Sequence, residues 1–126
     1  MKRADAPPDA DNPPMPPLAQ PLIDHHDAIV RLCRAHGVER LEVFGSAADG
    51  RFDPARSDFD FIARFSPRTG SSLARHYLEF IDQMESLLGR HVDLLGDGPI
   101  ENPYLRRAVD ASRRVLYDES ITQTPA

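Results

Sequence analysis

The sequence predicts an α/β or α+β fold in which a small mixed β-sheet is flanked by helices. The strongest strand signal lies at residues 58–65, where apolar and polar side chains alternate. The strongest helix signal lies at residues 72–88, where apolar side chains recur at helical spacing until Gly89 closes the pattern. Short apolar segments at residues 41–44 and 91–95 supply two more strands. We therefore expect the order helix, strand, strand, helix, strand, helix.

The first and last of these elements are helices with recognisable ends. Asp24 is the expected N-cap of the first, which runs to about residue 36 and stops at Gly37. The last begins with Asn102 as N-cap and Pro103 at the first helical position. We expect it to turn four apolar side chains inward: Tyr104, Leu105, Ala108 and Val109.

Proline content divides the chain. Seven of its 12 prolines fall within residues 1–21, and such a segment cannot bury enough apolar surface to offset its ordering entropy. We expect a disordered or polyproline-like arm over residues 1–21. One domain should follow over residues 22–118, with residues 115–117 ending the ordered region and a short tail over 119–126.

Composition excludes several classes of protein. With 15 basic and 20 acidic residues the net charge is −5, which argues against direct nucleic-acid binding. No apolar run approaches the roughly 18 residues that span a bilayer. Cys33 is the single cysteine, so an internal disulfide is excluded and a reducing, cytoplasmic setting is expected. Core packing is its expected role.

Three aspartates are the candidate catalytic and metal-binding groups. Asp58 and Asp60 share one face of the strand at residues 58–65, about 6–7 Å apart along the backbone. Asp93 interrupts an otherwise apolar strand. Each acid alone is also compatible with a water-facing strand. Together they form a carboxylate set of the kind that holds Mg²⁺ and deprotonates a hydroxyl.

Gly45 and Ser46 follow the strand at residues 41–44 and form a candidate phosphate-binding turn. Glycine allows a phosphate to approach the backbone, and the amides of the next turn with the serine hydroxyl can hold its oxygens. By itself, however, a Gly-Ser pair after a strand is most often an ordinary turn.

These segments together, at residues 44–50, 57–60 and 92–94, resemble the minimal nucleotidyltransferase (MNT) proteins of the DNA polymerase β superfamily. The resemblance extends over about residues 25–117. The spacer of eleven residues between Ser46 and Asp58 is longer than is common in these proteins.

The resemblance implies a polymerase-β-like nucleotidyltransferase fold and Mg²⁺-dependent transfer of AMP from ATP to a hydroxyl. It assigns triphosphate binding to Gly45 and Ser46, and metal binding to Asp58 and Asp60. Asp93 is implied to assist metal binding and to deprotonate the acceptor.

Arg64 is the preferred candidate for a further phosphate contact, because it shares the strand face of the aspartates. Arg51 and Arg56 are weaker candidates, and a solvated surface position is the alternative for all three.

Chains of this size resemble the MntA-like antitoxins of HEPN/MNT toxin–antitoxin systems. The implied partner is a helical HEPN ribonuclease toxin, bound as a hetero-oligomer, and the implied acceptor is a tyrosine hydroxyl on that toxin. Two alternatives stay open: nucleotidyl transfer to a small hydroxylated molecule, as in aminoglycoside-modifying relatives, and a non-catalytic antitoxin that blocks its partner by contact.

The histidines near the first helix do not predict a metal site. His25 and His26 are adjacent and point apart on a helix, and His36 lies three turns further on. We expect no metal bound among these three residues.

Overall fold

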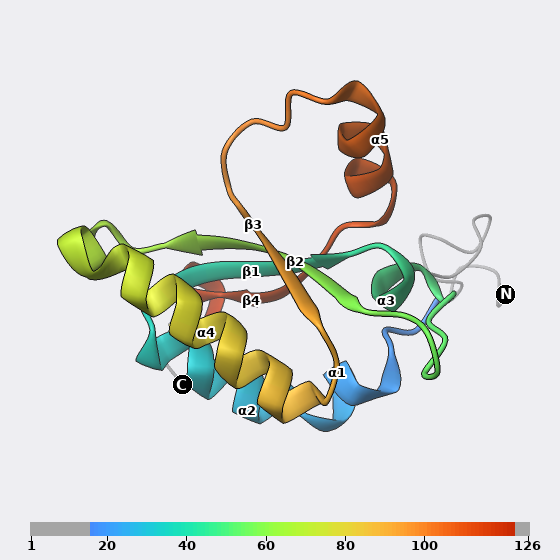
Figure 1. Cartoon of the computed structure of the whole chain (residues 1–126), viewed down its shortest axis with the longest axis horizontal. Helices are drawn as coiled ribbons and strands as arrows, with labels where there is room; N and C mark the ends of the chain where they lie inside the picture. The colour runs from blue at the N-terminus through green and yellow to red at the C-terminus, as the bar shows by residue number, and fades with distance from the viewer. Residues whose placement is uncertain (1–15, 123–126) are drawn as a thin grey trace, which may run out of the picture.

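The computed structural model describes residues 16–122, which form a four-stranded sheet with helices on both faces (Figure 1). The strands are β1 (Val38–Phe44), β2 (Phe59–Phe65), β3 (Val92–Gly96) and β4 (Arg114–Asp118). The helices are α1 (Gln20–Asp24), α2 (His26–Ala35), α3 (Ser46–Asp49), η2 (Pro67–Ser72), α4 (Leu73–Leu88), α5 (Pro103–Ser112) and α6 (Glu119–Thr122). Helices α1, α2 and α4 lie on one side of the sheet and α5 on the other (Figure 1). The expected fold class is confirmed.

The sheet is mixed, and its order is β3-β2-β1-β4. Strand β1 runs antiparallel to β2 and β4, whereas β2 and β3 are parallel. The edge strand β4 was not expected as a strand. Its five residues carry no clear alternation, and its pairing partner, β1, lies far earlier in the chain, as in the pair Leu41↔Tyr117.

The larger part of the core lies between the sheet and helices α2 and α4. Alternating side chains of β2 enter it, so that Phe59 and Phe61 are fully buried against Phe80 and Met84 of α4. Cys33 of α2 is buried in the same layer, and burial raises the pKa of its thiol to about 12. The expected alternation at residues 58–65 and the packing role of Cys33 are confirmed.

Helix α5 covers the other face with a single buried side chain. Val109 packs with Phe44 and Ile62 in a small second cluster. We expected four apolar residues of α5 to turn inward, and apart from Val109 this is wrong. Tyr104 is 77% exposed and Leu105 is 39% exposed. Ala108 is exposed as well. Figure 1 shows α5 standing away from the sheet, which leaves most of its apolar positions without a partner element.

The N-cap of α5 is as expected. The side chain of Asn102 accepts hydrogen bonds from the amides of Tyr104 and Leu105, and Pro103 occupies the first turn. By contrast, Asp24 is the last residue of α1 and not an N-cap, because the expected first helix is broken in two at His25.

Residues 16–19, at the end of the proline-rich segment, pack against α3. The Ala19 amide donates to the Ala47 carbonyl at 2.9 Å, and Ala19 is buried. Arg114 donates to the Pro16 carbonyl at 2.5 Å. The expected arm therefore overlaps the folded region at its end, and residues 1–15 lie outside the described part of the chain. The expected tail begins with α6, and residues 123–126 also lie outside it.

Helix α4 is the longest described helix, with 16 residues. Over residues 16–122 no helix combines the length and apolar character needed to cross a bilayer.

Candidate active site

Gly45 directly follows β1 and lies beside the side chain of Asp60. Its φ of +78° lies in the region that favours glycine. A Cβ atom on this residue would lie 2.9 Å from Oδ2 of Asp60. The β1–β2 register explains the contact, because Asp60 pairs with Phe44, the residue before the glycine. The expected phosphate turn and the expected carboxylate strand therefore meet.

Asp60 and Asp93 are neighbours across two strands. The parallel register of β2 and β3 pairs them directly, which places their carboxylates side by side. Burial raises the pKa of Asp60 to about 6, helped by the neighbouring carboxylates of Asp93 and Asp58. The nearby His91 acts weakly in the opposite direction. Two carboxylates held this close repel each other unless a proton or a cation lies with them.

Asp58 precedes β2 and faces an arginine that the sequence did not single out. Its Oδ1 lies 3.8 Å from Nη2 of Arg90. The same arginine donates to the carbonyls of Ser57 at 2.9 Å and Pro54 at 2.8 Å. Arg90 thus fixes the loop before β2 and supplies a counter-ion to Asp58, whose side chain is 46% exposed.

His91 orients Asp93. Its Nε2 lies 2.9 Å from Oδ1 of Asp93, and its Nδ1 lies 3.2 Å from Oε2 of Glu85. The hydrogen bond to Asp93 is the main reason why the pKa of His91 is raised. The sequence carried a signal for this pair, since residues two apart on a strand share a face.

Ser46 begins the short helix α3 directly after Gly45. The amides of Ala48 and Asp49 donate to the Gly45 carbonyl, which shapes the turn. The Gly45 amide in turn donates to Oγ of Ser112 in the last turn of α5, at 2.8 Å. Ser112 was not expected at the site, because only the fold brings α5 to this turn.

The residue after α5 fixes that helix to the sheet. Nη2 of Arg113 lies 2.7 Å from Oε1 of Glu42, and its Nε donates to Oε2 at 3.2 Å. Glu42 is 5% exposed, and the hydrogen bond from Arg113 is the main reason why its pKa is lowered. Arg40 on the same strand adds a contact at 3.6 Å.

The structure does not bring Arg64 to the aspartates. Its Nε lies 3.3 Å from Glu39, and its Nη1 lies 3.8 Å from Asp97. Four residues along a strand separate it from Asp60 by about 13 Å. A shared strand face therefore does not bring Arg64 close to the aspartates, because the position along the strand also decides how far apart two side chains lie. Arg51 and Arg56 likewise pair with acids in their own loop, at 2.6 Å with Asp49 and at 3.9 Å with Asp53.

The donor chemistry of the site fits a hard divalent cation. Asp58, Asp60 and Asp93 offer carboxylate oxygens at the ends of adjacent strands, and oxygen ligands suit Mg²⁺. Burial and the neighbouring carboxylates of Asp93 and Asp58 disfavour the ionised form of Asp60 and so raise its pKa. A bound cation would offset the charge of these carboxylates.

A cavity of about 400 Å³ opens on the same face of the sheet. Ile62, two residues after Asp60, and Ile100 form its apolar part, and charges of both signs line the rest: Arg106, Arg113, Asp97 and Asp110. This volume lies within the range of small-molecule sites.

Comparison with known proteins agrees with this geometry. The profile of the "Nucleotidyltransferase domain" family matches residues 27–116. A candidate protein adenylyltransferase of Methanocaldococcus jannaschii, MJ1379, is 34% identical over 73 residues, which is 58% of this chain and 71% of that protein.

Two solved structures share the fold. One, described as a candidate minimal nucleotidyltransferase, has a TM-score of 0.60 and 28% identity, and the match covers 75% of this chain and 92% of the other. The second is a complex of a tri-AMPylated Shewanella oneidensis HEPN toxin with an MNT antitoxin. Its matching chain has a TM-score of 0.53 and 17% identity, with 79% of this chain and 75% of the other covered.

Proposed function

Because the chain belongs to the nucleotidyltransferase domain family, we propose that it transfers AMP from ATP to a tyrosine hydroxyl of a HEPN ribonuclease toxin and acts as the antitoxin. The observation that carries the proposal is the contact between Gly45 and Asp60, with Asp93 paired to Asp60 on the next strand. This contact places a glycine turn suited to phosphate beside carboxylates suited to a metal ion.

Asp58, Asp60 and Asp93 are the proposed ligands of Mg²⁺. When bound, such an ion neutralises charge on the triphosphate and increases the electrophilicity of the α-phosphorus. Gly45 lets the phosphates approach the backbone, and Ser46 supplies a hydroxyl to them. The contribution of the chain is mostly positioning, as in other phosphoryl transfers.

The acceptor oxygen attacks the α-phosphorus, the bond to the β-phosphate oxygen breaks, and pyrophosphate leaves. Asp93 is the proposed base that takes the acceptor proton, and His91 holds its Oδ1 at 2.9 Å so that the carboxylate keeps one orientation. The cavity beside Ile62 and Arg106 is the proposed site for the nucleoside or for the incoming side chain.

A HEPN partner is supported by the fold shared with the chain from the toxin–antitoxin complex and by the protein-adenylyltransferase name of the relative MJ1379. We propose a hetero-oligomer with that partner, in which modification of the toxin silences it.

The test is transfer of label from ATP in source-cell lysate with added protein and Mg²⁺. We expect α-phosphate label, and no γ-phosphate label, in a protein band whose mass and modified tyrosine are then identified by mass spectrometry. Asp60→Asn should abolish this labelling, whereas Asp82→Asn, at an exposed position on α4, should leave it unchanged.

Other results would redirect the assignment. Label confined to small molecules would favour nucleotidyl transfer to a small hydroxylated acceptor. ATP binding without transfer from either position would contradict the catalytic proposal and favour an antitoxin that acts by contact.

A further inference from the structure

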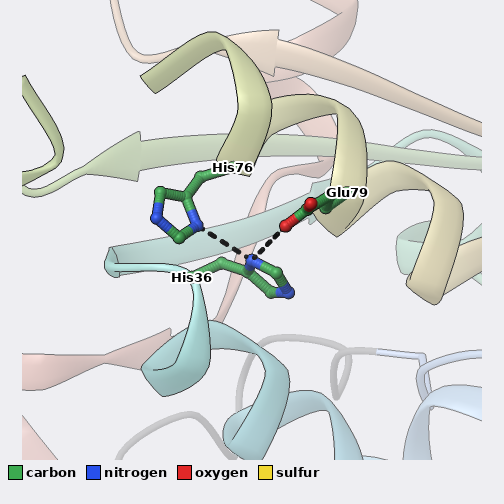
Figure 2. A group of neighbouring side chains, drawn as sticks. All are labelled: His36, His76 and Glu79. Atoms are coloured by element: carbon green, nitrogen blue, oxygen red, sulfur yellow. Dashed lines mark hydrogen bonds and ion pairs between the residues drawn. The ribbon is translucent and has the colours of Figure 1, made fainter. Parts of the chain in front are cut away.

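A second group of potential metal ligands lies at the opposite end of β1 from the aspartates. It consists of His36, His76 and Glu79, whose ligand atoms all lie within 4.8 Å of one another (Figure 2). His36 follows α2 and precedes β1, whereas Gly45 follows β1. The seven residues of this strand separate the two sites by about 20 Å. The group is therefore independent of the proposed nucleotide site.

The distances within this group are close to those between the ligands of one metal ion. Nδ1 of His36 lies 3.1 Å from Nδ1 of His76 and 3.9 Å from Oε1 of Glu79. Two ligands of a tetrahedral Zn²⁺ ion, each about 2.0–2.1 Å from it, lie about 3.3 Å apart. Figure 2 shows both α4 side chains directed at the same nitrogen of His36. Small rotations of His76 and Glu79 would close the three atoms around one ion.

A glutamine contacts the ring nitrogen of His36 that the other two ligands do not face. Nε2 of His36 lies 3.2 Å from Oε1 of Gln83, which accepts a hydrogen bond. Donation from Nε2 to this oxygen would leave the lone pair of Nδ1 for an ion held between His76 and Glu79. A partner that holds the far nitrogen of a ligating histidine is the usual outer contact of a protein metal site.

The three potential ligands come from two parts of the fold, the turn between α2 and β1 and the helix α4. His36 is 7% exposed and is set by the Gly37 turn, whose φ is +74°. His76 and Glu79 lie three residues apart on α4 and so share one helix face. Glu79 also contacts Arg75 at 3.5 Å, but this exposed pair is weak and leaves the carboxylate available.

We propose that His36, His76 and Glu79 bind one Zn²⁺ ion, with water as the fourth ligand. Two imidazoles and a carboxylate are typical donors for zinc, and a cavity of about 340 Å³ beside His36 and His76 gives the ion and its water a route of entry. The ion would join the end of α2 to α4. The role is stabilisation of this end of the domain, since binding to the folded state alone raises its stability.

The test is a calorimetric Zn²⁺ titration of the full chain carrying Asp60→Asn, which weakens zinc binding at the aspartates. We expect one ion per chain, and a loss of affinity of at least about tenfold when His76→Gln or Glu79→Gln is added. The matched control is His26→Gln, an exposed histidine of α2 outside the group, which should bind Zn²⁺ like its parent.

A second readout separates loss of the site from loss of the fold. Zn²⁺ should raise the melting temperature of the parent but not of the His76→Gln variant, with equal circular dichroism spectra before metal is added. Failure of Zn²⁺ to bind the parent, or equal affinity in the parent and both ligand variants, would overturn the proposal. Neither result would bear on AMP transfer, which is measured by labelling.

Discussion

Oδ2 of Asp60 lies 2.9 Å from the point that a Cβ atom would occupy on Gly45. Two features therefore favour glycine at this position: its φ of +78° and the carboxylate packed against it. The second requirement is tertiary, because the two residues come from adjacent antiparallel strands. It ties the geometry of the proposed phosphate turn to that of the proposed metal site.

We expect Gly45→Ala to reduce transfer by at least about 100-fold, because the methyl group would displace Asp60 or the turn, and a shift of about 1 Å can cost that much. The strained φ should also lower the free energy of unfolding by about 1–2 kcal/mol. Gly89→Ala is the matched control. That residue has φ +70° but nothing within 4 Å of the added Cβ. It should lose similar stability and keep its rate of transfer, measured with labelled ATP.

Asp60→Asn should make the metal-free protein more stable at neutral pH. The folded-state pKa of Asp60 is raised to about 6 from its ordinary value of 3.8, so the native state binds more protons between these values. Wild-type stability should therefore fall as the pH rises from about 4 to about 6, and the asparagine variant should lack this fall. At neutral pH its advantage should be about 1 kcal/mol, after allowance for solvent screening of a half-buried group.

Urea unfolding of both proteins across this pH range would measure the difference. Mg²⁺ should stabilise the wild type above pH about 6 and have a smaller effect on the variant. A wild type that gains stability as the pH rises from about 4 to about 6 relative to Asp60→Asn would contradict the assigned direction.

Glu42→Gln should lower the free energy of unfolding by about 2 kcal/mol at neutral pH, because it removes the buried charge that Arg113 faces. Since the folded-state pKa of Glu42 is lowered, this stabilisation is present above its unfolded pKa and is lost as the pH falls through the folded one. The difference from wild type should therefore shrink on acidification. Glu39→Gln, on the same strand and paired with the half-exposed Arg64, should cost less than about 1 kcal/mol.

Cys33 should resist thiol reagents in the native protein. It is buried, so a reagent cannot reach the sulfur. Its pKa is raised to about 12, so the reactive thiolate does not form at neutral pH. Labelling in denaturant should be complete, and native labelling should proceed only through unfolding. Fast native modification that leaves the circular dichroism spectrum unchanged would contradict the packing role.

The sequence was sufficient for much of the fold and for the family. Alternation at residues 58–65 and the helical pattern at residues 72–88 are local, and both elements occur where predicted. The resemblance to minimal nucleotidyltransferases rested on segments in the strands and turns around Gly45, Asp60 and Asp93, and the family match confirms it. The metal and triphosphate roles of these residues stay predictions.

The expectation for α5 was wrong because a partner element, and not the helix itself, decides which of its side chains are buried. Tyr104 and Leu105 have the spacing of a buried helix face, but α5 touches the sheet mainly through Val109. The phosphate contact expected of Arg64 stays a prediction; its side chain pairs with Glu39 and Asp97 at the other end of β2.

What the sequence determined by itself is periodicity, the C-terminal end of α4, the N-cap of α5 and the chemical types in the site, because these depend on neighbours within a few positions. Only the tertiary structure decided that β4 pairs with β1, that Ser112 binds the Gly45 amide, and that His36 meets His76. These contacts join residues 40 or more positions apart. Their free energy comes from burial and strand register, which no local pattern of side chains encodes.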